Sequence, residues 1–308
     1  MTEKTIMVFT YLKIAKRLPR RFREKVERLP WHPFNLMERY CLWQAERSGP
    51  PFRPSHRKII IDITAACNLR CTDCNRSCAP NQAPSKENMD IAQIEKFLDQ
   101  SIQQGRMWET ISIEGGEPTL HPQLKDIVHL LIQYRKRYSP KTFINIQTNG
   151  FGEKNRSVVA DLPIDEVYVY NSGKSSIIQQ KHLPFNMAPC DEACFYGYDY
   201  SIGCYLPACY GLGLNRNGFY PHPVCGGIDR VLGLDIGRKQ LPHIHDSMRD
   251  HFRKLCPLCG FFRFMTMQRN KKRARKQFEI RQQRGTISGT WLNLYEQYRK
   301  EPPRLSKY

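Results

Sequence analysis

The sequence predicts an α/β protein built on a parallel sheet. Short β-branched runs alternate with amphipathic helical segments, and each run ends in glycine or polar residues. With 308 residues, 40% hydrophobic and 11% aromatic, the chain can bury a core in one large domain or two smaller ones. Because ligands of such sheets lie beyond the carboxyl ends of the strands, we expect the functional site there.

The predicted elements follow in order along the chain. Helical segments in residues 10–47 are interrupted by prolines, and the composition of 48–56 predicts a linker. Asp90 is a suitable N-cap for the first core helix, which shows helical periodicity. The predicted strands lie within 57–64, 109–118, 142–150 and 165–173, and the predicted helices span 90–104 and 123–137.

Four regions are expected from composition. Residues 1–55 form a basic helical extension, 56–185 the α/β core, 186–265 a small cysteine-rich domain, and 266–308 a basic helix with a loose tail. The net charge of +19 lies on the flanks, because Lys and Arg outnumber Asp and Glu by 14 to 5 in residues 1–60 and by 13 to 3 in residues 261–308. These flanks predict either contact with RNA, an anionic surface or an acidic partner, or solvated helices packed on the core.

The location expected from the sequence is the cytoplasm. The apolar run of residues 6–12 is short and is followed by Lys13, so we expect no signal peptide and no transmembrane segment. In a reducing compartment the twelve cysteines are expected to be metal ligands or catalytic thiols before they are disulfides.

Three cysteines follow the first predicted strand in the spacing C-x3-C-x2-C. Cys67, Cys71 and Cys74 lie in one short loop, and thiolates are ligands for iron–sulfur clusters and zinc. Three thiolates leave one iron of a four-iron cluster open, whereas zinc requires a fourth ligand, which Cys78 would supply. The loop therefore predicts an open cluster, with a structural zinc site as the alternative.

With the sequences that end the later strands, this loop resembles the radical S-adenosylmethionine (SAM) superfamily. "EGGEP" at 114–118 is similar to the family's GGEP motif, "QTNG" at 147–150 to its TNG element, and "VYNSG" follows at the end of the next strand. The resemblance covers residues 57 to about 185. It implies a partial (β/α)6 TIM-like barrel and a [4Fe–4S] cluster whose open iron binds SAM.

The resemblance also implies reductive cleavage of SAM to a 5′-deoxyadenosyl radical, with flavodoxin or ferredoxin as reducing partner. It places Gly115, Gly116 and Glu117 at the methionine end of SAM. Polar groups that would reach the ribose or carboxylate are Thr148, Asn149 and Ser172; ordinary turn chemistry is the alternative for each. Where the family carries an aromatic residue that contacts adenine, this chain has Asp73.

The cysteine-rich region resembles the twitch form of the SPASM-like domains that follow many radical SAM barrels. Its predicted ligands for a second [4Fe–4S] cluster are Cys209, Cys225, Cys256 and Cys259. Cys204 is the alternative to Cys209, and His222 is either a further ligand or a turn residue. A zinc ribbon with the same thiolates is the structural alternative.

The remaining cysteines of this region have two interpretations. Cys190, Cys194 and Cys204 are candidate hydrogen-atom donors to a substrate radical, or small core residues. A thiol that donates a hydrogen atom to the substrate radical predicts an epimerase. A cluster near the substrate instead predicts an oxidising enzyme. Candidate substrate contacts, which surface positions would equally explain, are Tyr170, Lys174, Asp191, Glu192 and Asp199.

Three classes of function follow. The leading hypothesis is a radical SAM oxidoreductase or epimerase acting on a small polar substrate such as a sugar or aminocyclitol. The second is modification of RNA or a peptide that docks on the basic flanks. The third is a non-enzymatic zinc or iron–sulfur binding module.

Overall fold

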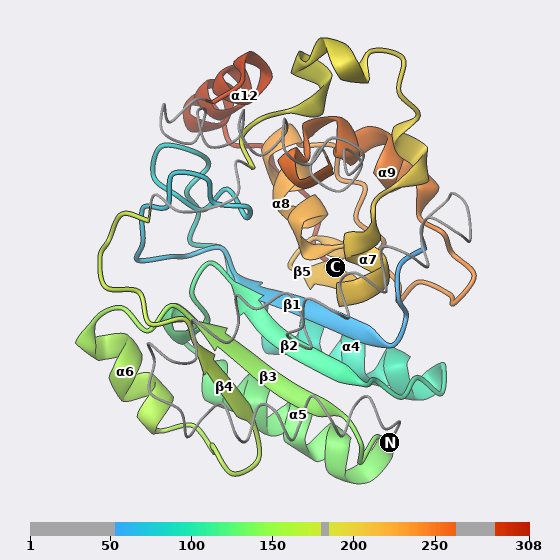
Figure 1. Cartoon of the computed structure of the whole chain (residues 1–308). Helices are drawn as coiled ribbons and strands as arrows, with labels where there is room; N and C mark the ends of the chain where they lie inside the picture. Colours follow the sequence, from blue (N-terminus) through green and yellow to red (C-terminus); the bar gives the residue numbers. More distant parts are fainter. Residues whose placement is uncertain (1–52, 180–184, 263–286) are drawn as a thin grey trace, which may run out of the picture. The chain divides into compact units, whose positions relative to one another are not determined.

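The computed structural model of the chain describes residues 53–179, 185–262 and 287–308 (Figure 1). The N-terminal helical extension and most of the basic helix predicted after residue 266 lie outside the described residues. From Pro51 to Tyr308 the chain forms one compact unit. No helix in the described ranges combines the length and apolar character needed to cross a bilayer.

The sheet has six strands in the order β4-β3-β2-β1-β5-β6. Neighbours from β4 through β5 are parallel, and β6 is antiparallel to β5. The predicted α/β class is therefore confirmed. The strands are β1 (Lys58–Thr64), β2 (Thr110–Gly115), β3 (Phe143–Thr148), β4 (Tyr168–Asn171), β5 (Leu212–Asn215) and β6 (Gly218–Tyr220).

The alternation of strands and helices runs from β1 to β4, and the sheet then grows in the other direction from β1. There β5 and β6 form a hairpin whose two-residue loop, Arg216–Asn217, allows antiparallel pairing without a crossover helix. The side chain of Asn215 accepts a hydrogen bond from the Asn217 N–H at 2.8 Å, which closes this turn.

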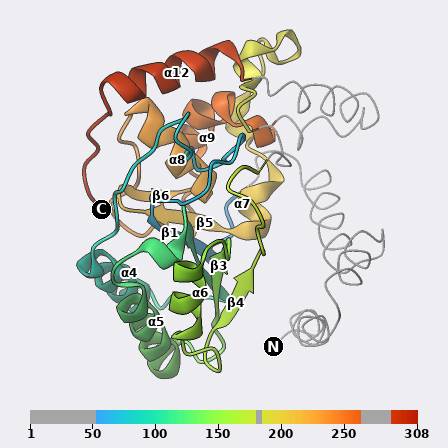
Figure 2. The same cartoon turned by 90° about the vertical axis from the view of Figure 1, so that its left-hand side faces the viewer.

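Helices α4 (Ile91–Gln103) and α5 (Leu124–Tyr138) pack on one face of the sheet (Figures 1 and 2). Alternate residues of the strands point toward them, and Ile61, Ile113 and Ile146 are fully buried in this core. Gln93 accepts a hydrogen bond from the Asp90 N–H at the predicted start of α4. A third helix on the chain between β3 and β4, α6 (Glu153–Ala160), was not predicted.

The cysteine-rich segment lies over the opposite face of β5 and contains helices that its sequence did not predict. A Cβ on Gly213 would lie 2.4 Å from Pro223, so α8 packs tightly on that face of β5. Gly226 and Gly227 weaken the helical pattern of α8, yet they allow contacts with Asn215 and Arg76 that a side chain would block. The helices are α7 (Tyr205–Tyr210), α8 (Pro223–Leu232) and α9 (Arg249–Leu255), with short 3-10 turns at Pro189–Asp191, Ala193–Phe195, Tyr200–Ile202 and Cys256–Leu258.

The predicted loose tail is wrong. After α12 (Gly289–Lys300) the chain returns to the core, where the ring of Tyr308 lies 5.0 Å from that of Phe219 and is 6% exposed. The Tyr308 hydroxyl donates a hydrogen bond to Gln100 on α4. Burial of the Tyr308 ring stabilises this end of the chain against the core, although the residues before it are polar.

Candidate active site

The three thiols of the predicted cluster loop lie close together at the carboxyl end of β1. All three are half-buried and free. Burial, together with the nearby thiols of Cys74 and Cys71, raises the pKa of Cys67 to about 12. Burial also raises the pKa of Cys71 to about 11. Since bound metal reverses such shifts, this donor set fits three irons of a four-iron cluster.

Cys74 differs from the other two thiols. Hydrogen bonding from the Cys78 thiol, opposed by burial, lowers the pKa of Cys74 to about 6. The backbone N–H of Cys78 also donates to the Cys74 Sγ at 3.4 Å. Cys78 is buried beside Cys74, and whether it is a metal ligand stays a prediction.

The loop is fixed on its outer side by backbone and side-chain contacts. The N–H groups of Arg70 and Thr72 donate to the carbonyls of Ile177 and Gln179. Asp73 accepts a hydrogen bond from the Asn186 N–H at 3.2 Å, and burial raises its pKa to about 6. Asp73 thus supports the loop, and a contact with adenine would have to be polar here or come from another residue.

The GGEP sequence packs directly against the start of the cysteine loop. A Cβ on Gly115 would lie 2.4 Å from the Thr64 carbonyl oxygen, and one on Gly116 would lie 2.2 Å from that of Ala66. Gly115 also has a φ of +131°. Both glycines are therefore required by the contact between β1 and β2, apart from any approach of SAM.

Glu117 joins the ends of β2 and β3. It is 1% exposed, and its carboxylate accepts hydrogen bonds from the hydroxyls of Thr119 and Thr148, both at 2.7 Å. Its second oxygen accepts from the Asn149 N–H at 2.7 Å. The charge of Glu117 acts on Cys67, which places the carboxylate beside the cluster loop.

The other predicted SAM contacts join this network. The Asn149 side chain donates to Asn68 in the cysteine loop at 2.8 Å. The Ser172 hydroxyl donates to the Thr148 carbonyl at 3.1 Å. The structure therefore brings the predicted residues together at the carboxyl ends of β2, β3 and β4, where they hold one another in place.

A row of polar side chains crosses the sheet on the face opposite α4 and α5, and the sequence analysis missed it. The pairing of strands β1 to β5 aligns one residue of each strand in a row across the sheet. One pattern in the sequence could have revealed this row. Isoleucine or valine alternates with polar residues in "ISIE", "INIQ" and "VYVY". The polar row consists of Asn215, Asp62, Glu114, Gln147 and Tyr170.

Arg76 of the cysteine loop lies on the polar row. Its guanidinium bonds Asp62 at 2.8 Å and Glu114 at 2.9 Å, and all three side chains are 16% exposed or less. Gln147 donates to the other oxygen of Glu114. Exposure rises along the row to 43% at Tyr170, so the row opens toward β4.

Burial changes the acidity of both carboxyl groups under Arg76. It raises the pKa of Glu114 to about 7, with Arg76 opposing the shift and the Asp62 charge adding to it. Burial likewise raises the pKa of Asp62, against the effect of Arg76. The pKa of Glu114 is therefore close to neutral pH, where a carboxyl group can both accept and release a proton.

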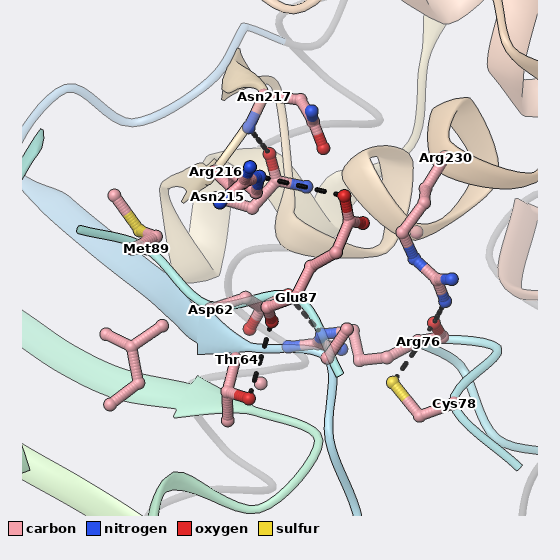
Figure 3. Close-up of a pocket in the computed structure, with 14 residues that line it drawn as sticks. Asp62, Thr64, Arg76, Cys78, Glu87, Met89, Asn215, Arg216, Asn217 and Arg230 are labelled. Carbon is pink, nitrogen blue, oxygen red and sulfur yellow. Dashed lines mark hydrogen bonds and ion pairs between the residues drawn. The ribbon is translucent and has the colours of Figure 1, made fainter. Parts of the chain in front are cut away.

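Behind the loop lies a cavity of about 30 Å³, room for one or two water molecules. Its lining combines Asp62, Arg76 and Cys78 with residues of the β5–β6 hairpin and α8 (Figure 3). One oxygen of Asp62 has no hydrogen-bond partner among the described residues, and it faces a volume suited to water. The cavity lies beside the contact that α8 makes with the cysteine loop through Arg230.

A second group of buried thiols lies in the cysteine-rich segment. The Cys225 thiol is affected by the charges of Cys259 and Cys204, and the Cys256 thiol by those of Cys225, Cys204 and Cys259. All four are 4–6% exposed. Among the described residues no three His, Cys, Asp or Glu side chains converge closely enough for a single metal ion.

Cys209 and His222, the other predicted participants, have different surroundings. Cys209 is buried in α7, and its carbonyl accepts from Lys58 at 3.0 Å. His222 is the N-cap of α8, where its Nδ1 accepts from the Val224 N–H. Burial lowers the pKa of His222 to about 3. The neutral His222 imidazole fits its capping contact.

The remaining candidates do not form one cluster. Tyr170 belongs to the polar row, and the positive charge of Lys174 acts on the Cys71 thiol. Asp191 accepts from the Thr290 N–H at 3.1 Å, and Asp199 accepts from the Ser201 N–H at 3.0 Å. Glu192 is half-buried; Cys190 is half-buried beside Asp191, and the side chain of Cys194 is outside the described part.

The comparison with protein families agrees with this arrangement. Residues 61–169 match the radical SAM superfamily. The chain contains a radical SAM domain. The cluster loop, the GGEP sequence, the TNG element and most of the polar row lie within the matched segment, and the family implies a [4Fe–4S] cluster with SAM.

Similar curated proteins match part of the same domain. The GTP 3′,8-cyclase of Chlorobaculum tepidum is 36% identical over 70 residues, which is 23% of this chain and 20% of that protein. The GTP 3′,8-cyclase of Mycobacterium marinum is 28% identical over 119 residues, 38% of this chain and 32% of that protein. The chain thus matches at most about a third of the length of these relatives.

Similar solved structures include BtrN in complex with AdoMet and 2-DOIA, with 16% identity and a TM-score of 0.39, covering 69% of this chain and 91% of that chain. Another is SuiB of Streptococcus suis bound to the precursor peptide SuiA, with 17% identity and a TM-score of 0.27, covering 44% and 28%. Nothing about substrate follows from scores below 0.5.

Proposed function

We propose that the chain is a radical SAM enzyme that oxidises or epimerises a small hydroxylated substrate, such as a sugar or aminocyclitol, over the polar row. The observation that carries this proposal is the polar row itself, which extends from beneath the cysteine loop toward the exposed Tyr170. When bound, the cluster and SAM supply a 5′-deoxyadenosyl radical that abstracts a hydrogen atom. The chain's own residues hold the cluster and SAM, orient the substrate and accept the proton that the substrate loses.

The cluster loop and the strand ends provide the SAM site in this proposal. Cys67, Cys71 and Cys74 hold the cluster. Oε2 of Glu117 accepts only the Asn149 N–H among the described residues, so it keeps capacity for an ammonium donor. Thr148 and Asn149 act through Glu117 and the loop, because their side chains already bond Glu117 and Asn68.

The charge of the polar row favours hydroxyl and amine groups on the substrate. Asp62 and Glu114 are acceptors, Tyr170 and Gln147 add neutral polar groups, and the Arg76 cation is bonded to both carboxylates. A triphosphate would meet these carboxylates without a free matching cation on the described row. We therefore favour a sugar or aminocyclitol over the GTP named for the curated relatives.

Glu114 is suited to hold the proton that an alcohol loses during oxidation. Conversion of a secondary alcohol to a ketone removes one hydrogen atom, one proton and one electron. A carboxyl group with a pKa near 7 accepts such a proton at neutral pH. Epimerisation instead requires return of a hydrogen atom, for which Cys190 and Cys194 are the candidates, and Cys204 is one only where it is not a cluster ligand.

The buried thiols are proposed to bind a second, twitch-like [4Fe–4S] cluster. The charge interactions favour Cys204, with Cys225, Cys256 and Cys259, as the ligand set. Cys209 remains the alternative to Cys204. A redox centre here would accept the electron released during oxidation. It would pass this electron to a cytoplasmic partner such as flavodoxin or ferredoxin.

The test uses the full chain after anaerobic reconstitution with iron and sulfide. Reduced enzyme is incubated with SAM and, in separate reactions, with aminocyclitols, amino sugars or GTP, and 5′-deoxyadenosine and product are measured. We expect turnover with a hydroxylated amine and a large loss in Glu114→Gln. Zinc without sulfide, or turnover with GTP alone, would overturn the proposal.

A further inference from the structure

Helix α8 connects the two groups of thiols. Cys225 lies in its first turn, and Arg230 lies further along the same helix. Figure 3 shows the Arg230 side chain extending from α8 toward Arg76 and Cys78. A buried arginine between the two sites has no role in the chemistry proposed above.

Arg230 binds the turn that follows Cys74. One of its guanidinium nitrogens donates to the carbonyls of Arg76 at 3.0 Å and Ser77 at 3.2 Å. The other donates to the Ala83 carbonyl at 2.7 Å and the Tyr298 hydroxyl at 2.8 Å. Arg230 is 5% exposed, so these four bonds replace its hydration.

The bound turn has a strained backbone that serves a specific contact. Ser77 has a φ of +55°, which is unfavourable for a residue with a side chain. This conformation accompanies the bond from the Cys78 N–H to the Cys74 Sγ. Four contacts hold the strained residue: its carbonyl accepts from Arg230 and from the Ala83 N–H, its N–H donates to the Cys74 carbonyl, and its Oγ lies 3.1 Å from the Tyr295 hydroxyl.

From these contacts we propose that Arg230 is a positioning residue that holds the turn 76–78, so that the Cys78 N–H bonds a ligand sulfur and sets the reduction potential of the SAM cluster. The proposal rests on the proposed function, because it requires a cluster on Cys74. Hydrogen bonds to cluster sulfurs and nearby positive charge stabilise the more negative, reduced cluster. Loss of Arg230 therefore makes the cluster harder to reduce.

The experiment compares a parent chain with Arg230→Met and Arg230→Lys, and uses Arg216→Met as matched control. Arg216 lines the same cavity, but its side chain bonds Asn88 and Glu87 instead of the turn. Each full chain is reconstituted, its iron and sulfide are counted, and the SAM cluster is titrated by electron paramagnetic resonance. To observe this cluster alone, all four chains carry Cys256→Ala.

We expect Arg230→Met to lower the equilibrium constant for one-electron reduction at least about tenfold, equivalent to ~59 mV. Arg230→Lys keeps the charge but not the four-bond geometry, and should show a smaller decrease. The Arg216 control should match the parent. If Arg230→Met fails to fold, the Arg230→Lys decrease alone decides the proposal.

Unchanged potentials in the Arg230 variants would overturn the inference while leaving the proposed function intact. A parent chain that binds no cluster would instead overturn the proposed function. An equal decrease in Arg216→Met would show a general charge effect and would also overturn the positioning role.

Discussion

The two groups of thiols differ in how the chain assembles them. Cys67, Cys71 and Cys74 come from one loop and stay half-buried at the strand ends. The second group comes from three places in the sequence, around α7, α8 and the turn after α9, and each of its thiols is buried. One site is therefore open and local, and the other is closed and depends on tertiary packing.

The difference suits two different tasks. An open site on a short loop leaves a coordination position accessible, as binding of an exchangeable cofactor requires. A closed site with four ligands excludes solvent and substrate, as suits electron storage or structural support. The open loop needs rigidity from elsewhere: its own Arg76 bonds Asp62 and Glu114 of the sheet, and Arg230 binds it from α8.

The largest expected effect is the loss of one cluster without the other. Cys74→Ala should abolish 5′-deoxyadenosine formation and remove about half of the iron, because two four-iron clusters contribute equally. Cys256→Ala should remove the other half and leave SAM cleavage measurable. Iron, sulfide and 5′-deoxyadenosine are measured after reconstitution.

A Cys78→Ala chain is the control for the open loop, because it retains the backbone N–H that bonds Cys74. It should keep the iron of both sites. Loss of the open-site iron in this control would show that Cys78 is a ligand, and the comparison of open and closed sites would then be wrong.

The second effect concerns the fourth ligand of the closed site. Cys204→Ala should remove the iron of this site, because the charge of Cys204 acts on Cys225 and Cys256, and Cys209→Ala tests the alternative ligand. Iron content and the absorbance of the second cluster decide between them. The reverse result would assign Cys209.

These two sites also show how far the sequence could be interpreted. The open site was predicted from local spacing, because its three thiols and the strand before them lie within seventeen consecutive residues, 58–74. Choosing between Cys204 and Cys209 required the positions of α7, α8 and α9, which no local pattern contains. The ligand sets themselves stay predictions until metal is measured.

The polar row shows a different limit. Four of its strands were predicted, and their alternation was present in the sequence, but the registers of two strand pairs were needed to align Asp62 with Glu114 and Gln147. Arg76 looked like an ordinary loop residue, since only the fold places it over two carboxylates. The burial of Tyr308 was likewise invisible in a polar tail.

A third prediction tests whether the open loop depends on the sheet beneath it. Arg76→Met leaves Asp62 and Glu114 buried without their cation, so the free energy of unfolding at pH 7 should fall by about 3–5 kcal/mol. Denaturant unfolding of the apo chain measures it. The exposed pair of Lys125 with Asp161 is the control, because Lys125→Met should cost less than about 1 kcal/mol. Equal decreases in the free energy of unfolding for Arg76→Met and Lys125→Met would show that the loop does not depend on Arg76.

The smallest effect is a pH dependence that arises from Glu114 alone. Its pKa is raised from 4.5 to about 7, so the folded chain keeps the proton that the unfolded chain releases. The free energy of unfolding contributed by this group is therefore full below about pH 4.5 and decreases as pH rises through 7. Glu114→Gln should remove a decrease on the order of 2–3 kcal/mol between pH 5 and 8.

The sign of this dependence distinguishes Glu114 from surface carboxylates. Glu166 is exposed, and hydrogen bonding with Lys136 lowers its pKa, so Glu166→Gln should not flatten the decrease seen above pH 5. If Glu114→Gln leaves the pH profile of unfolding unchanged, Glu114 is ionised like a surface group. It would then be a fixed acceptor for substrate hydroxyls, and the proton released during oxidation would need another base on the polar row.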